Sequence, residues 1–387
     1  MSEMQSVFPL DDHEVCPCGS NMLFSTCCKG KKDSVRMDTK KPIQVQIMEM
    51  MRRSMEKCCM HPDRQSCKGR IKEAHALQNN KIISLLAGQE RHVYMLNPKK
   101  QPIIIQLENG EFDSIIEVDH VSANDATTET CFCDLHDNTA FAIIEKGAPA
   151  FNCDDEAMKF TYAYKAFIFE YYKQWMALKI FRQNFSKYPQ TFQQPEMVAM
   201  YRMLQMKMSE FEPVKAHFDH EILAGTCDGI ETCIVKIPEQ IKFANYAYIA
   251  PDFDLNGNQI KHTIDGMMYR LAITVIPEES ESYILLSCLK QEPQVYCDLF
   301  QQLMNSSLDK IKYFFSMILP LYSENMVLSP TLWNKWNEEI RMAYTFLANA
   351  KGPSAVGLSM AIGMGFSNAA LDEKFDYSQR GKIDLFV

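Results

Sequence analysis

Residues 16–28 read CPCGSNMLFSTCC, and this stretch decides how the N-terminal part of the chain folds. Zn²⁺ prefers four soft ligands in a tetrahedron with Zn–S distances of about 2.3 Å. Because a stretch this short has no hydrophobic core, metal binding would supply its folding free energy. The alternative is four free thiols or a redox pair. Four cysteines within thirteen residues make this alternative less favoured than a metal site. The spacing therefore predicts zinc at Cys16, Cys18, Cys27 and Cys28.

This pattern, CPCGS followed by Cys27-Cys28-x-Gly30, resembles the SEC-C motif. That zinc knuckle stands at the C-terminus of the preprotein-translocase ATPase and is an accessory in many bacterial proteins. In the translocase it contacts a chaperone and the ribosome, so the resemblance implies an adaptor role. It covers about fifteen of the 387 residues, and the chain has no G-x-x-x-x-G-K-[ST] phosphate loop. An ATPase is therefore excluded.

A second zone of cysteine and histidine predicts another zinc site. Two half-sites, one from a loop and one from a turn entering a helix, are typical of a treble clef. The preferred ligands form a Cys₃His set: Cys59, Cys67, Cys133 and His136. Other residues that could substitute for one of them are Cys58, His61 and Cys131. The long insertion at 68–132 would hold strands and a helix.

This second zone resembles the zinc module of uncharacterised bacterial proteins that carry an SEC-C knuckle, and more loosely the HNH endonucleases. The HNH resemblance implies that His75, at a strand end after Glu73, activates water. Asn138 or Asp137 would orient the site, and Mg²⁺ would neutralise phosphate charge. The first half-site departs from the family pattern, with Cys-x₇-Cys in place of Cys-x₂-Cys.

His75 has a second interpretation. The apolar spacing of residues 71–87 also fits a helix. On such a helix His75 would be the fourth zinc ligand or a hydrogen-bonded core residue.

Charge is distributed unevenly along the chain. Residues 1–28 carry −4, residues 29–72 carry thirteen Lys/Arg against five acids for +8, and residues 73–387 carry −13. The basic segment 29–72 could bind a protein partner or nucleic acid. A solvated helix whose charge offsets the thiolates is the alternative.

The chain is expected to have an α+β fold: a zinc knuckle, a treble-clef-like zinc module, and a larger domain of helices with an antiparallel sheet. Expected domains are the knuckle at 1–30, a basic linker at 31–57, the zinc module at 58–150, the larger domain at 151–349, and a mobile tail at 350–387. Helices are expected at 156–185, 196–211, 295–304, 308–321 and 331–349, and a strand or helix entry at 43–51. Strands are expected at 93–96, 102–107, 231–237, 247–250, 268–276 and 283–289, with an Asn109-Gly110 turn.

Other signals are weaker. Asp252–Gly257 opens like a calcium loop, but position 12 is Thr263 and an Asn-Gly hairpin turn fits better. No long apolar run predicts a membrane span, and the acidic N-terminus predicts no secretory signal. The sequence therefore predicts a cytoplasmic, bacterial, zinc-binding protein that acts as an adaptor with two structural Zn²⁺ ions. An HNH-like, Mg²⁺-dependent nuclease, acting in defence against foreign nucleic acid, is the alternative.

Overall fold

The structure is a computed structural model in which the chain forms two compact units. Unit 1 comprises Met1–Lys57 and Tyr171–Ala216, and unit 2 comprises Cys58–Glu170 and His217–Val387. The structure describes residues 10–349 and 383–387, apart from 37, 39, 42, 98–99, 101–102, 107–111, 146 and 148. The domain boundaries expected from the sequence stay predictions.

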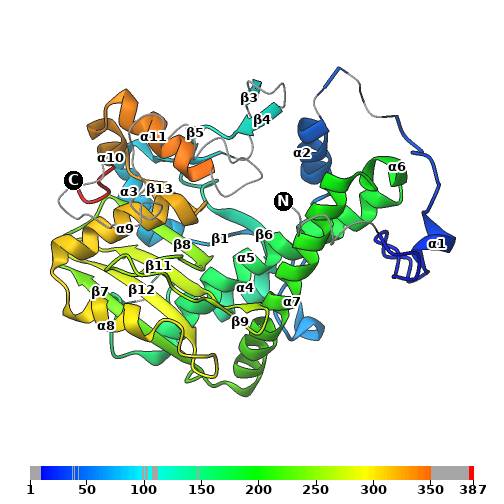
Figure 1. The fold of residues 1–387 in the computed structure, drawn as a ribbon. Helices are drawn as coiled ribbons and strands as arrows, with labels where there is room; N and C mark the ends of the chain where they lie inside the picture. Colours follow the sequence, from blue (N-terminus) through cyan, green and yellow to red (C-terminus); the bar gives the residue numbers. More distant parts are fainter. Residues whose placement is uncertain are drawn as a thin grey trace. The chain divides into compact units, whose positions relative to one another are not determined.

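Unit 2 is built around a seven-stranded antiparallel sheet, and the fold is α+β as predicted (Figure 1). The strand order is β5-β2-β13-β8-β11-β12-β7. The strands are β2 (His92–Leu96), β5 (Val118–Ser122), β7 (Ile230–Ile237), β8 (Phe243–Ile249), β11 (Leu271–Pro277), β12 (Ser282–Leu289) and β13 (Met326–Leu328). Every residue of β11 is buried, as expected for an apolar strand covered on both faces of the sheet.

Most of the expected strands are present, with two differences. The strand expected at 247–250 begins earlier, at Phe243 in β8. The run expected at 268–276 is divided, because β10 (Met267–Met268) pairs with β9 (Thr263–Ile264) while β11 joins the large sheet. The expected strand at 102–107 is β3 (Ile103–Gln106), paired with β4 (Phe112–Ile115). The predicted Asn109-Gly110 turn lies outside the described residues.

Four helices pack with this sheet into the main core (Figure 1). They are α8 (Cys297–Asn305), α9 (Leu308–Tyr322), α10 (Pro330–Lys335) and α11 (Glu338–Asn349). The single helix expected at 331–349 is interrupted at Trp336, whose backbone is extended. Its buried indole donates a hydrogen bond to the carbonyl of Asp384 at 3.2 Å, so tertiary packing breaks the helix there. No helix within the described ranges is long and apolar enough to cross a membrane.

The last five residues correct the expectation of a mobile tail at 350–387. Residues 350–382 lie outside the described part of the chain, but residues 383–387 are packed in unit 2. Ile383 and Leu385 are buried in the main core, and the backbone N–H of Leu385 donates to Ser316 Oγ at 3.1 Å. The predicted tail is therefore wrong for these five residues.

A second, two-stranded sheet in unit 2 carries the zinc-module sequence. β1 (Ile71–His75) pairs antiparallel with β6 (Thr128–Cys133), and α4 (Asp134–Ala140) follows directly. The helix expected at 71–87 is therefore wrong at its start. Residues 71–75 form a strand because β6 supplies their backbone partners, which overrides the local helical spacing. Helical turns begin only at Asn79 and continue through α3 (Ser84–Ala87).

Two long helices contribute residues to both units. α5 (Glu156–Phe185) has the predicted bounds, and its aromatic stripe is mostly core, with Phe167 and Tyr172 fully buried. α7 (Pro195–Ala224) runs past the expected end at residue 211, and Pro213 lies inside it.

Unit 1 contains helices and no strand among its described residues. The sequence predicted a strand or a helix entry at 43–51, and this segment is a helix, α2 (Ile43–Ser54). The short helices are α1 (Phe24–Cys27) and α6 (Pro189–Phe192). Phe24 packs edge-on against Phe185 with ring centroids 6.5 Å apart, and Arg202 forms an ion pair with Glu14 at 2.6 Å.

Leu385→Ala should lower the free energy of unfolding by about 2–5 kcal/mol, because it opens a cavity in the main core. Urea unfolding followed by circular dichroism measures this change. Val387→Ala is the control, since Val387 is 46% exposed and its truncation should cost less than about 0.5 kcal/mol. Equal effects of the two substitutions would contradict the packing described for the C-terminal residues.

Candidate metal centres

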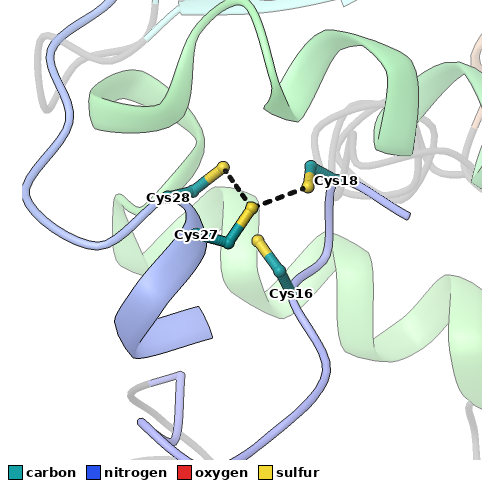
Figure 2. Close-up of side chains that lie close together, drawn as sticks. All are labelled: Cys16, Cys18, Cys27 and Cys28. Atoms are coloured by element: carbon teal, nitrogen blue, oxygen red, sulfur yellow. Dashed lines mark hydrogen bonds between the residues drawn. The ribbon is translucent and has the colours of Figure 1, made fainter. Parts of the chain in front are cut away.

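The first candidate metal centre lies in unit 1 and consists of Cys16, Cys18, Cys27 and Cys28. Their sulfur atoms all lie within 4.8 Å of one another, and Figure 2 shows them gathered around one point. Cys16 and Cys18 lie on a loop, whereas Cys27 ends α1 and Cys28 caps it. The structure therefore brings together all four residues of the predicted knuckle.

Local backbone geometry creates this arrangement. A β-bridge between Val15 and Leu23 closes the loop, and the N–H of Cys16 donates to the carbonyl of Met22 at 2.8 Å. Gly19 has a φ of +78°, a left-handed conformation that favours glycine, and its N–H donates to the carbonyl of Cys16. The chain can therefore reverse immediately after the first two thiols.

The sulfur spacing fits a tetrahedral metal ion. Two sulfurs on a tetrahedral Zn²⁺ ion at about 2.3 Å lie about 3.8 Å apart. The Sγ–Sγ distance is 3.5 Å between Cys18 and Cys27 and 3.7 Å between Cys27 and Cys28. The hydroxyl oxygen of Ser20 lies 3.2 Å from the Cys27 sulfur, where it can donate a hydrogen bond to a thiolate.

Burial keeps two thiols of this cluster protonated without a metal. Burial raises the pKa of the Cys16 thiol to about 11 and also raises that of Cys28, where neighbouring thiols add to the effect. Burial opposes ionisation of Cys18 as well, but hydrogen bonds with Ser20 and nearby thiols lower its pKa to about 7. A dication would stabilise the thiolates, so metal binding must displace protons.

The second candidate metal centre lies in unit 2 and consists of Cys59, Cys67, Cys133 and His136. Its four ligand atoms also lie within 4.8 Å of one another. Cys133 ends β6, and His136 lies in the first turn of α4. These are the ligands preferred from the sequence.

The distances identify which nitrogen of His136 faces the metal position. His136 Nδ1 lies 3.3 Å from the sulfurs of Cys59 and Cys133 and 3.6 Å from that of Cys67. A tetrahedral site with Zn–S of about 2.3 Å and Zn–N of about 2.0 Å predicts separations of about 3.6 Å. Burial lowers the pKa of His136, which keeps its imidazole neutral and able to bind a metal.

Backbone contacts join the two halves of this second centre. The N–H of Met60 donates to the carbonyl of Cys131 at 2.8 Å, and that of Asp134 donates to the carbonyl of Arg70 at 3.0 Å. Gly69 has a φ of +78°, and a Cβ atom there would lie 2.4 Å from Asp134 Oδ2. Glycine therefore allows the strand β1 to start close against α4.

Three residues considered as substitute ligands stand outside the second cluster. The His61 ring stacks on the His136 ring, with centroids 3.8 Å apart. The Cys58 sulfur lies 3.7 Å from the carbonyl oxygen of Cys59, and Cys131 is fully buried. None of these belongs to a group of converging ligand atoms within the described residues.

His75 and Asn138, the two residues considered for catalysis, lie beside the second centre and not in it. His75 ends β1, and its Nδ1 lies 2.9 Å from the carbonyl oxygen of Ala126. Asn138 is exposed on α4 and accepts a hydrogen bond from Lys72 at 3.3 Å. Burial lowers the pKa of His75 and raises that of Asp137.

The sequence interpretation missed three residues near these sites. Ser66 contacts His136, with 2.9 Å between Oγ and Nε2. Lys165, whose ammonium group is buried, forms an ion pair with Glu145, and both charges act on His75 and Asp137. Glu145 and Lys165 are far from His75 in sequence and belong to no motif, so only the fold reveals them.

The loop that opens like a calcium site does not have free oxygen ligands. Both carboxylate oxygens of Asp254 accept hydrogen bonds, from Asn256, Asn258 and Gln302. Asn256 Oδ1 accepts a hydrogen bond from Lys310. These contacts agree with the turn that the sequence favoured over a calcium loop.

Comparison with protein-family models, curated proteins and solved structures finds no match for this chain. The resemblances to the SEC-C motif and to HNH enzymes therefore depend on individual residues. What the structure itself supports is two Cys/His clusters that could hold two metal ions, an arrangement consistent with zinc.

Zinc binding to the first cluster at pH 7 should release at least about two protons, because burial keeps Cys16 and Cys28 protonated without metal. Calorimetric titration in two buffers of different ionisation enthalpy measures this number. The affinity should rise with pH, since protons compete with the metal. A pH-independent affinity with no proton release would contradict metal binding by these thiols.

Proposed function

We propose that this chain is a zinc-binding protein that acts by binding a partner, with both Zn²⁺ ions structural. The observation that carries the proposal is that each cluster supplies four converging ligands, Cys₄ in one and Cys₃His in the other. Four protein ligands complete a tetrahedral shell, whereas a catalytic zinc ion keeps one position for water or substrate.

The chemistry of the ligands supports zinc. Thiolate sulfur and imidazole nitrogen in a tetrahedral set are typical of zinc or iron–sulfur sites, and hard ions such as Mg²⁺ prefer oxygen. The histidine ligand in the second cluster and the short sulfur-to-nitrogen distances favour one Zn²⁺ ion.

Exposed apolar side chains in unit 1 support a binding role. Across the described residues, unit 1 holds seven of the twelve exposed large apolar side chains, although it is about a quarter of the chain. They are Val15, Met22, Leu23, Val35, Met55, Met203 and Met206. Val15 and Leu23 are opposite each other on the knuckle's β-bridge. We infer that these side chains contact a protein partner, for which methionine is suited because its flexible side chain adapts to varied surfaces.

Charge supports a partner that is acidic. Unit 1 has 16 Lys/Arg and 11 Asp/Glu, for a net charge of +5, whereas the rest of the chain has 24 and 38, for −14. Among the described residues, the exposed large apolar side chains of unit 1 include no aromatic residue, the type on which nucleic-acid bases most often stack. These features favour an acidic protein segment over nucleic acid.

Met22→Glu should reduce capture of a partner at least tenfold, because it places a negative charge on the apolar surface of the knuckle. Full-length protein is cross-linked in lysate of its source cells, and the captured proteins are quantified by mass spectrometry. Met304→Glu is the matched control, since Met304 is also exposed but lies in unit 2. Equal capture by both variants, no capture by wild type, or tight binding to oligonucleotides instead would contradict the proposal.

A second candidate function, an HNH-like nuclease, is favoured by the tautomer of His75. Because a carbonyl oxygen can only accept, the contact with Ala126 places the proton of His75 on Nδ1. Nε2 then carries the lone pair that a general base needs, and burial keeps the ring neutral. The order of β1, β6 and α4 around a Cys₃His cluster also agrees with this resemblance.

If the chain is a nuclease, it should cleave DNA or RNA in the presence of Mg²⁺, and His75→Ala should lower the rate at least about 100-fold. The rate should rise with pH around a midpoint below 6.5, because the pKa of the base is lowered. Gel assays with plasmid, linear DNA and RNA measure this. His120→Ala, an exposed histidine on β5, is the control. Absence of cleavage on all substrates rejects this second function.

A further inference from the structure

The two ring nitrogens of His136 have different surroundings. Nδ1 faces the three sulfurs of the second centre, at 3.3–3.6 Å. Nε2, on the other side of the ring, lies 2.9 Å from the hydroxyl oxygen of Ser66. A histidine binds a metal through one nitrogen, and the group that contacts the other nitrogen sets its tautomer and orientation.

The direction of the hydrogen bond follows from the other contacts of Ser66. Its hydroxyl donates to the carbonyl oxygen of Asp63 at 3.2 Å, and a hydroxyl has one proton to donate. The oxygen is therefore left as an acceptor toward His136. A proton on Nε2 satisfies this contact and leaves the lone pair on Nδ1, the nitrogen that faces the sulfurs.

Ser66 is itself held in place by the turn between the two thiols of the first half-site. Residues Arg64–Ser66 form a 3₁₀ turn, and the N–H of Ser66 donates to Asp63 Oδ1 at 3.3 Å. The N–H of Asp63 donates to His61 Nδ1 at 3.2 Å, and the His61 ring stacks on the His136 ring. The loop 61–66 thus contacts the His136 ring twice, at its edge through Ser66 and on its face through His61.

We propose that Ser66 is a positioning residue for the second metal site: its oxygen accepts the Nε2 proton of His136 and directs Nδ1 to the metal. The proposal rests on the proposed zinc binding. The positioning role adds that the loop between Cys59 and Cys67 orients the imidazole of His136, besides supplying thiolates. Loss of a contact of this kind typically weakens metal binding about 10- to 100-fold.

The experiment compares Ser66→Ala with wild type in the full chain, loaded with Zn²⁺ and titrated with a competing chelator. Zinc at the second site should be lost at about 10- to 100-fold lower chelator concentration in Ser66→Ala, while the first site is unchanged. Loading with ¹¹³Cd²⁺ assigns the loss, because Cys₄ and Cys₃His sites give separate NMR signals. Ser66→Thr keeps the hydroxyl and should restore most of the affinity.

Ser20→Ala is the matched control, since Ser20 contacts a sulfur of the first centre. It should leave the second site unchanged. A readout independent of affinity is the ¹⁵N spectrum of His136 in wild type, which should show a protonated Nε2 that exchanges slowly with water. Ser66→Ala should speed that exchange.

Several results would overturn the proposal. Metal bound through Nε2, or affinity at the second site within twofold of wild type in Ser66→Ala, would reject Ser66 as a positioning residue while zinc binding stands. Wild-type protein that binds no metal at either site would reject the proposed function itself. The two failures are therefore distinguishable.

Discussion

The antiparallel pairing of β1 with β6 is the constraint on which the second metal centre depends. It brings Cys59 and Cys67 beside Cys133 and His136, across a long insertion in the chain. Closing so long a loop costs conformational entropy, although the cost grows only slowly with length. The insertion also contributes to the core of unit 2, since it contains β2 and β5 of the seven-stranded sheet. Formation of the second metal centre and formation of the sheet of unit 2 therefore involve the same segment of the chain.

The two centres differ in how they are supported. The first is made by one short loop and one turn of helix, with a hydroxyl near one sulfur. The second draws on a loop, a strand and a helix, and its imidazole is contacted on its edge and its face. Each cluster has four converging ligand atoms, so a metal ion bound at either one would contribute to folding. Any chemistry would have to come from groups beside them, such as His75.

Ligand positions could be predicted because thiols and imidazoles clustered at short spacings are typical of metal sites. The strand at Ile71–His75 was harder to predict, since its apolar spacing also fits a helix. Only pairing with the partner strand β6 makes this segment a strand. Ser66 gives no signal in the sequence, because a serine before a cysteine is commonplace. The closing residues 383–387 read IDLFV and are apolar except for Asp384, a composition that could have indicated burial of Ile383 and Leu385.

The ligands of the first centre are close together in the sequence, whereas those of the second are far apart, and this difference has a consequence for biosynthesis. All ligands of the first centre have left the ribosome once residue 28 has emerged, whereas the second centre must wait for residue 136. During synthesis the first ligand set is therefore complete before the second one. A chain whose synthesis stops between residues 28 and 136 would thus contain one complete ligand set and only part of the other.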